Sequence, residues 1–254
     1  MLIGKNAIVT GARTGIGKAI VYKFVQSGVN VWAVVHREDK DWLEEIQMIA
    51  MVHNVWIRPI YIDLNDEAEI AIGIKQIIQE RLSIDILVNA AGVVSPNRLI
   101  QMTPLAEMHR VMQVNFFAAV QICQLVSRVM CRQKKGSIIN IASIAGIDGD
   151  LAQLEYASSK AALICATKKM AYEWGNYGVR VNAIAPGLTE TKMLDTMDDQ
   201  VTIEMVKKNT LGRKGKPHEV ANLCVFLADE QSSYITAQTI RIDGGGINFA
   251  STIK

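Results

Sequence analysis

Residues 6–21, NAIVTGARTGIGKAIV, decide the fold that the rest of the chain follows. The run begins with β-branched apolar residues, which are typical of a buried strand. Gly11, Gly15 and Gly17 come next, and a helical pattern begins at Ile16. A strand, a glycine turn and a helix in this order direct free N–H groups and the positive end of the helix dipole at an anion. The stretch therefore predicts a site for the pyrophosphate of a dinucleotide.

Apolar strand-like runs and helical patterns alternate along the whole chain after this stretch. We expect further strands at residues 30–35, 55–61, 86–88, 137–141, 179–185 and 239–242. We expect helices at residues 41–52, 66–81, 103–135 and 217–227, and another that carries residues 156 and 160. Such alternation forms βαβ units, in which helices cover both faces of a parallel sheet. The sequence predicts one α/β domain over residues 1–254, a doubly wound Rossmann-type fold with about seven strands.

The overall composition excludes several classes of function. The 254 residues are 50% hydrophobic, and 27 basic against 25 acidic side chains give a net charge of +2, so no global field favours nucleic acid or an anionic membrane. The four cysteines form no CxxC pair and the four histidines form no HExxH motif, so we expect no metal site. The start lacks the apolar core of a signal peptide, and the longest uncharged run, 111–127, is too polar and too short to span a bilayer. We expect a cytoplasmic protein with reduced thiols.

The densest group of reactive side chains lies in residues 143–160, SIAGIDGDLAQLEYASSK. Tyr156 and Lys160 are four residues apart, so on a helix they share one face and can contact a common ligand. A phenol has an ordinary pKa near ~10, and a nearby cation favours the tyrosinate. Ser143, at the end of an expected strand, could hold a substrate oxygen. The set suits proton exchange with an alcohol or a carbonyl, although the pair alone is also typical of an ordinary helix surface.

Several motifs together resemble the short-chain dehydrogenase/reductase family, from residue 3 to about residue 246. The turn TGARTGIG has three residues between its first two glycines, where the common Rossmann fingerprint has one. NAAG at residues 89–92, Asn115, Ser143, the YxxxK pair and the Pro186–Gly187 turn follow in the family's order. Within the family, GLTETKM and the tail from residue 212 to residue 245 are most similar to 3-oxoacyl-acyl-carrier-protein reductases.

The resemblance implies an enzyme that transfers a hydride between a nicotinamide and a ketone or secondary alcohol. In the family, the serine and tyrosine bind the carbonyl oxygen and the tyrosine protonates it, which gives these roles to Ser143 and Tyr156. Lys160 would tune the phenol and bind the nicotinamide ribose. Asn115 would hold a water connected to the lysine. The local residues allow a second interpretation of Asn115, a structural hydrogen bond to a neighbouring strand.

The region after the second strand bears on the choice between NAD(H) and NADP(H). An NAD-specific site would place an acid for the ribose 2′-hydroxyl near the end of this strand, where Val35 stands. Arg13, His36 and Arg37 could instead surround a 2′-phosphate, so we expect NADP(H) to be favoured over NAD(H). Against this, the acids at residues 38 and 39 could turn toward the ribose.

The resemblance also implies the residues that contact the cofactor. Thr14 stands where many NADP enzymes of the family carry a basic residue, and Asp63 matches an aspartate that contacts the adenine, although it could also be a turn or cap residue. The complete expected set is Gly11, Arg13, Thr14, Gly15, Ile16, Gly17, His36, Arg37, Asp63, Leu64, Asn89, Ala90, Ala91, Gly92, Tyr156, Lys160, Pro186, Gly187, Thr189 and Thr191.

Residues 188–216 are expected to form a substrate lid, and they end in the basic run KKNTLGRKGK. This run is either a solvated surface or a site for an anionic substrate or carrier. The resemblance favours a 3-oxoacyl thioester on an acyl carrier protein or coenzyme A, yet only Lys134 matches a carrier-binding position, because Tyr177 occupies the other. A sugar, polyol or other small secondary alcohol is the alternative substrate. A nucleotide-binding sensor without catalysis is the alternative of another class. The family also leads us to expect a homo-oligomer, a tetramer or a dimer.

Overall fold

A computed structural model describes residues 2–149, 153–194 and 199–246. Its centre is a sheet of seven parallel strands in the order β3-β2-β1-β4-β5-β6-β7. The strands are β1 (Asn6–Thr10), β2 (Asn30–Val35), β3 (Ile57–Tyr61), β4 (Ile86–Asn89), β5 (Gly136–Ile141), β6 (Val179–Pro186) and β7 (Thr239–Ile242). The strand order reverses between β1 and β4, which is the point where doubly wound folds bind their ligands. The expected α/β class is confirmed.

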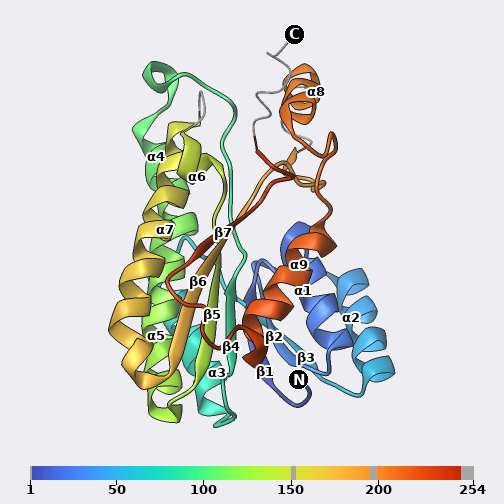
Figure 1. Cartoon of the computed structure of the whole chain (residues 1–254). Coiled ribbons are helices and arrows are strands. Elements are labelled where there is room, and N and C mark those ends of the chain that lie inside the picture. Colours follow the sequence, from blue (N-terminus) through green and yellow to red (C-terminus); the bar gives the residue numbers. More distant parts are fainter. Residues whose placement is uncertain (1, 150–152, 195–198, 247–254) are drawn as a thin grey trace.

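Helices cover both faces of this sheet (Figure 1). On one face lie α1 (Gly15–Gln26), α2 (Lys40–His53) and α9 (Pro217–Ala228), and on the other lie α3 (Glu67–Gln79), α5 (Ala118–Gln133) and α7 (Leu154–Trp174). Alternate strand residues enter the two layers. In β1, Ala7 and Val9 pack with the first layer and Ile8 with the second. The continuous apolar strands of the sequence are therefore explained by burial from both sides.

The helical stretch expected at residues 103–135 is present as Leu105–Gln133, but its geometry is not regular throughout. It consists of α4 (Leu105–Met112), a π-helical turn (Gln113–Phe117) and α5. A separate 3-10 turn (Ile100–Met102) precedes it, and Thr103 and Pro104 between them are extended. A π turn inserts one residue into a helix and redirects the side chains after it, and such turns are frequent at functional sites. Here the turn is centred on Asn115.

The same helical segment, Leu105–Gln133, is long and apolar enough to cross a membrane by length and composition alone. Half of its most apolar part is buried in the fold. Ile122, Val126 and Met130 of α5 pack against the sheet and against α3, which accounts for their apolar character.

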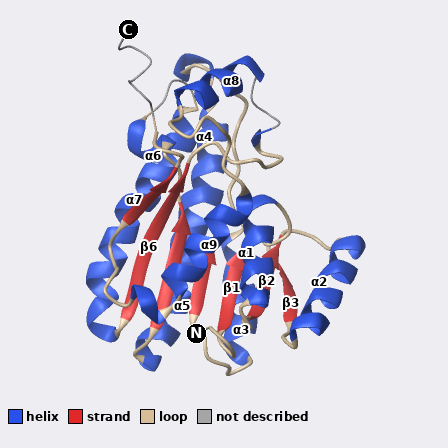
Figure 2. Ribbon diagram, turned by 45° about the vertical axis from the view of Figure 1, so that its right-hand side comes forward, coloured by secondary structure: helices blue, strands red, loops and turns tan. Residues whose placement is uncertain are grey.

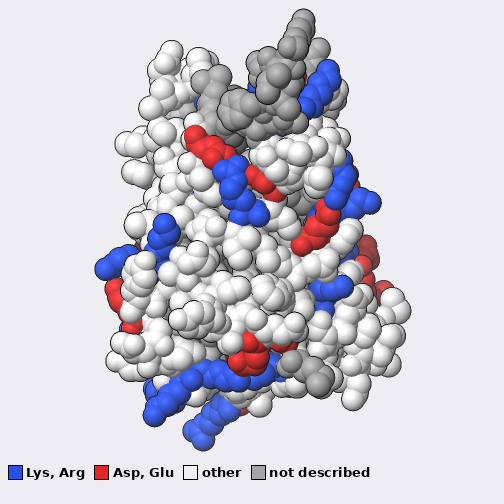
Figure 3. All heavy atoms as spheres, in the orientation of Figure 1, with Lys and Arg blue, Asp and Glu red and all other residues white. Residues whose placement is uncertain are grey.

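The chain beyond each strand's carboxyl end builds one end of the molecule (Figure 2). A short helix α6 (Ala145–Asp148) follows β5, and α8 (Asp199–Lys208) lies within the segment expected to be a lid. Short 3-10 turns at Gly175–Tyr177 and Glu230–Ser232 lie at the opposite ends of the strands. Acidic and basic groups are interspersed over the face drawn in Figure 3, in keeping with the small net charge.

Candidate active site

A cavity of about 370 Å³ opens at the carboxyl ends of the central strands. Its polar floor combines Ser143 from the end of β5 with Tyr156 and Lys160 from the first turns of α7. The expected catalytic serine, tyrosine and lysine thus line one space. Nine residues of the expected cofactor set also line this cavity: Ile16, Ala90, Gly92, Tyr156, Lys160, Pro186, Gly187, Thr189 and Thr191.

The glycine turn next to this cavity is shaped by close backbone contacts. A Cβ atom on Gly17 would lie 2.1 Å from the carbonyl oxygen of Gly11, and one on Gly11 would lie 2.8 Å from Cα of Ala91. Thr10 Oγ1 accepts hydrogen bonds from the backbone N–H groups of Ala90 and Ala91, both at 3.0 Å. The turn and the NAAG segment are therefore one packed unit, in which no side chain could replace these two hydrogens without moving the backbone.

The N-terminus of α1 fits an anion such as a pyrophosphate. The helix begins at Gly15, the side chain of its N-cap Thr14 accepts no hydrogen bond from the backbone N–H groups of the first turn, and that turn contains no acid. The first N–H groups of a helix have no partners inside it, and the dipole adds positive potential there. The donors of this turn and the absence of an opposing carboxylate in it match the requirements of a dinucleotide phosphate.

Burial controls the protonation of the two reactive groups. Lys160 is 4% exposed, and burial lowers the pKa of its ammonium to about 8. Burial also raises the pKa of Tyr156, and its hydrogen bond with Ser143 opposes that rise. The ammonium lies 5.8 Å from the centre of the phenol ring and donates to the carbonyl oxygen of Ile141 at 2.9 Å. The expectation that a nearby cation favours the tyrosinate is thus incomplete, because desolvation is the largest effect on the pKa of Tyr156 and raises it.

Asn115 makes structural hydrogen bonds, but its partners lie in the segment after β4 and in α7 and not in a neighbouring strand. Its Oδ1 accepts from the N–H of Val93 at 2.8 Å, and its Nδ2 donates to the carbonyl of Val93 at 2.9 Å and to Ser159 Oγ at 3.1 Å. Ser159 in turn donates to the carbonyl of Tyr156 at 2.7 Å. The amide therefore ties the segment after β4 to the first turn of α7, and a direct side-chain contact with the cavity is not part of the arrangement.

The groups expected around the adenosine ribose are engaged with acids. Arg13 forms an ion pair with Asp39 at 2.7 Å, and His36 lies 3.6 Å from Asp63. The backbone N–H of Trp42 and the guanidinium of Arg13 lower the pKa of Asp39, which is the N-cap of α2. Arg37 is exposed, and its charge also acts on Asp39. The two guanidinium groups and the imidazole are therefore gathered beyond the end of β2, with the carboxylate of Asp39 among them.

Asp63 has the contacts of a turn residue. Its Oδ1 accepts from the backbone and side-chain nitrogens of Asn65, each at 2.9 Å. The backbone N–H of Asp63 donates to Glu69 at 2.8 Å. An adenine contact from this carboxylate would therefore use its Oδ2, the atom that faces His36.

The wall of the cavity contains apolar residues that the sequence analysis did not name individually, although four of them lie within residues 188–216, the expected substrate lid. They come from the segment after β4, the residue after Ser143, the turn after β6 and α8: Val94, Ile144, Leu188, Met193, Leu194 and Met205. Asn97 and Gln153 add two amides, and Gln153 donates to the carbonyl of Ser95 at 3.3 Å. No local signal marks these residues, because they come together only when the strand ends converge.

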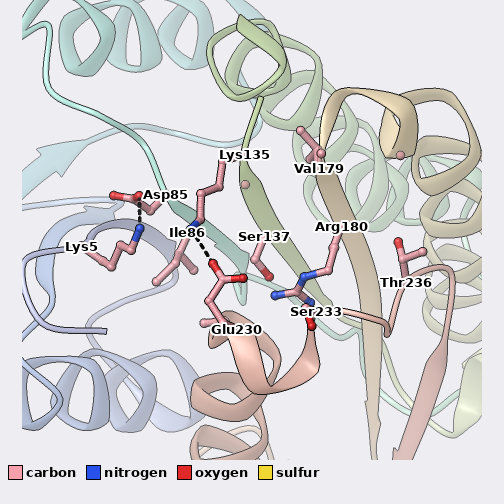
Figure 4. Close-up of a pocket in the computed structure, with 14 residues that line it drawn as sticks. Lys5, Asp85, Ile86, Lys135, Ser137, Val179, Arg180, Glu230, Ser233 and Thr236 are labelled. Atoms are coloured by element: carbon pink, nitrogen blue, oxygen red, sulfur yellow. Dashed lines mark hydrogen bonds and ion pairs between the residues drawn. The ribbon is translucent and has the colours of Figure 1, made fainter. Parts of the chain in front are cut away.

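A second cavity, of about 260 Å³, lies at the opposite ends of the strands (Figure 4). It contains three cations, and each has a partner. Lys5 pairs with Asp85, Lys135 pairs with Glu230, and the guanidinium of Arg180 donates to backbone carbonyls at the end of α9. These pairings stabilise the base of the sheet and leave no free charge for a ligand among the labelled residues.

Comparisons with known proteins agree with this geometry. A family model described as enoyl-(acyl carrier protein) reductase matches residues 11–246. The chain is similar to the 3-oxoacyl-[acyl-carrier-protein] reductase FabG of Thermotoga maritima, with 36% identity over 96% of this chain and 98% of the relative. A solved structure from Beutenbergia cavernae, assigned as an NAD(P)-dependent gluconate 5-dehydrogenase and holding NADP, covers 96% of each chain at 30% identity and a TM-score of 0.90.

A second solved structure, assigned as a gluconate dehydrogenase of Agrobacterium tumefaciens, has a TM-score of 0.89 at 27% identity and likewise covers 96% of each chain. The family match spans the glycine turn, the reactive residues and the last strand, and the relatives align over nearly their whole lengths. The chain belongs to the short-chain dehydrogenase/reductase family of NAD(P)-dependent oxidoreductases.

Proposed function

We propose that this enzyme reduces the 3-oxo group of an acyl thioester, with NADPH as the preferred hydride donor. The observation that carries the proposal is the cavity itself, in which Ser143, Tyr156 and Lys160 share a floor under an apolar wall. A bound nicotinamide would supply the hydride. The protein's own residues would bind the carbonyl oxygen, place the acyl chain and deliver the proton.

Tyr156 is the proton donor in this proposal. Its buried phenol remains protonated at neutral pH because burial raises its pKa, so it can give a proton to the oxygen that gains charge as the carbonyl is reduced. Ser143 lies on the same cavity and would orient that oxygen through its hydroxyl. Lys160, with a pKa of about 8, can release and regain a proton near neutral pH and would restore the phenol.

Asn115 supports this set from behind. Through Val93 and Ser159 it fixes the segment after β4 against the turn of α7 that carries the phenol. Its π-helical turn also leaves irregular backbone beside Lys160, and a water held there would connect the lysine to solvent. We therefore propose that the backbone of this turn holds the water, while the side-chain amide of Asn115 is occupied by its bonds to Val93 and Ser159.

The apolar wall favours an acyl chain. Burial of each CH₂ group contributes about 0.8 kcal/mol, and the wall offers Leu188, Met193 and Met205 for such contacts. A sugar acid would need donors or cations for several hydroxyls and a carboxylate, and the wall provides the amides of Asn97 and Gln153. A sugar or polyol remains the second candidate, because two solved structures of similar fold are assigned as gluconate dehydrogenases.

A substrate panel with matched variants tests the proposal. We expect oxidation of NADPH with β-ketoacyl thioesters, faster than with keto-sugars, in the wild type. Tyr156→Phe should retain cofactor affinity and lose turnover by about 100-fold or more, because it removes only the acidic hydroxyl. Tyr172→Phe, an exposed position on the same helix, is the control. Turnover close to normal in Tyr156→Phe would contradict the assignment of the proton donor.

The preference for NADPH is tested through Arg13. Its guanidinium would hold the 2′-phosphate in place of, or together with, its present partner Asp39. We expect kcat/KM to be higher with NADPH than with NADH, and Arg13→Gln to reduce this ratio by about 10-fold, which is ~1.4 kcal/mol. Lys18→Gln, which breaks an ion pair between α1 and Glu45 of α2, should leave the ratio unchanged. A wild-type preference for NADH would refute the cofactor assignment.

A further inference from the structure

Arg241 and its neighbours connect three chain segments: α6, the end of β7 and the residues that follow α8. Arg241 lies in β7, and its two terminal nitrogens donate to both carboxylate oxygens of Asp148 at 2.7 and 2.8 Å. Its Nε donates to Asp243 at 2.8 Å. The guanidinium is thus shared between α6 and the turn after β7, and the two acids raise its pKa.

Asp148 connects Arg241 to α6, the short helix that contacts Ser143 and Lys160. Asp148 ends α6, a single turn that starts two residues after Ser143. The hydroxyl of Ser143 accepts from the N–H of Ala145 at 3.2 Å. A Cβ atom on Gly146 would lie 2.7 Å from the backbone carbon of Lys160, so α6 is packed without a gap against α7. A displacement of α6 would therefore move Ser143 relative to Lys160.

Asp243 and the turn after β7 are hydrogen-bonded to the segment after α8. Asn209 donates to the carbonyl of Asp243 at 2.6 Å, and the N–H of Leu211 donates to the carbonyl of Gly244 at 3.1 Å. These bonds fix the residues that follow α8 to the turn after β7. Met205 of α8 lines the cavity a few residues earlier in the chain. The turn after β7 is therefore bonded to the residues that follow α8, the helix whose Met205 lines the cavity.

Arg241 neutralises the two carboxylates, Asp148 and Asp243, that it holds together. Asp148 and Asp243 are both acidic, and Arg241 is the cation that the described structure places between them. The Asp243 side chain is only 9% exposed, so water screens it poorly. Single exposed ion pairs contribute little, but a forked guanidinium held by two carboxylates is geometrically specific. Without the cation the two acids would repel each other across the gap.

We propose that Arg241 is a positioning residue, which holds the α6 turn behind Ser143 in register with the segment that follows α8. Its role in the reaction rests on the proposed function, because it assumes that Ser143 orients the carbonyl. Arg241 does not touch substrate in this arrangement. It fixes the distance between the group that binds the carbonyl oxygen and the wall that binds the rest of the substrate.

Steady-state kinetics give the first test. Arg241→Gln should lower kcat/KM for the carbonyl substrate by about 10-fold through a higher KM and a lower kcat, while the Kd for NADPH changes less than about twofold. Asp148→Asn should lower kcat/KM in the same way but by less, because Arg241 keeps its pair with Asp243. The double variant should be no worse than Arg241→Gln alone, because that substitution already removes the interaction with Asp148. Arg241→Lys should be intermediate, since an ammonium cannot form the fork.

Arg110→Gln is the matched control. It breaks another forked pair, in which Arg110 donates to Glu107 on α4 at 2.7 and 3.0 Å, and it should leave kcat/KM unchanged. Additive effects of the Arg241 and Asp148 substitutions, or normal kinetics in Arg241→Gln, would overturn the proposal.

Hydrogen exchange gives a test that needs no substrate. In Arg241→Gln, amides of residues 144–148 and of residues 209–212 should exchange faster together, while those of α4 should not change. Unchanged exchange in either segment overturns the positioning role. A wild type that reduces no carbonyl compound would instead refute the proposed function, and the exchange experiment would still decide whether Arg241 couples the two segments.

Discussion

Replacement of Lys160 by methionine should stabilise the protein, by an amount that depends on pH. Lys160 is 4% exposed, and its pKa falls from 10.5 to about 8 because burial disfavours the ammonium. At about 1.4 kcal/mol per pKa unit, this difference corresponds to roughly 3 kcal/mol of unfolding free energy lost by keeping the charged form inside. Methionine has a similar length and no charge, so Lys160→Met removes this cost.

The sign of the pH dependence follows from the direction of the shift. The folded pKa is below the unfolded one, so the unfolded chain binds the proton more tightly. Below about pH 8 both states are protonated, and the full cost is present. Between about pH 8 and pH 10.5 the folded state releases the proton first, so the cost declines as pH rises. The lost hydrogen bond to Ile141 offsets the gain by about 1 kcal/mol.

Urea unfolding of the wild type and Lys160→Met across this pH range measures the effect. The variant should be more stable by about 2 kcal/mol near neutral pH, and its advantage should shrink by roughly 3 kcal/mol by about pH 10.5. Lys169→Met, an exposed position on the same helix, should show a difference that does not vary with pH. A pH-independent difference for Lys160→Met would refute the argument that burial sets the protonation of this lysine.

Two further substitutions test the packing around the same helix. In Gly92→Ala the new Cβ would lie 3.3 Å from Lys160 Nζ and 3.4 Å from Asn115 Oδ1. We expect kcat to fall by about 10-fold while the melting temperature stays nearly unchanged. A normal kcat would show that the lysine tolerates displacement. Glu155 is 2% exposed, and its Oε2 has no hydrogen-bond partner among the described residues. Glu155→Gln should therefore raise the unfolding free energy by about 1 kcal/mol in urea titrations, whereas a loss of stability would reveal a partner for the carboxylate.

The elements defined by short-range patterns were predictable from the sequence. The glycine turn, the parallel strands and the helical spacing of Tyr156 and Lys160 follow from local periodicity, and the structure reproduces each of them. The carboxyl ends of neighbouring parallel strands lie at one edge of a sheet. For this reason the sequence could also predict that Ser143 would meet the tyrosine and lysine.

The π turn around Asn115 could not be predicted from the helical pattern. A regular helix and a π turn have nearly the same local preferences, and the choice depends on what the amide finds to bind. Here it finds the backbone of Val93, a partner 22 residues away in sequence. The effect of burial on the pKa of Tyr156 and Lys160 could not be predicted for a similar reason. Desolvation depends on all the elements packed around a group.

The sequence by itself determined the fold class, the glycine turn and which candidate site residues would come together, because these depend on spacings within one element or on the shared edge of a parallel sheet. The tertiary structure alone decided the partners of the charged groups. Arg13 meets Asp39 at a separation of 26 residues, and Arg241 meets Asp148 at a separation of 93. Such pairs leave no periodic trace in the chain, since each depends on where two loops end after the sheet has formed.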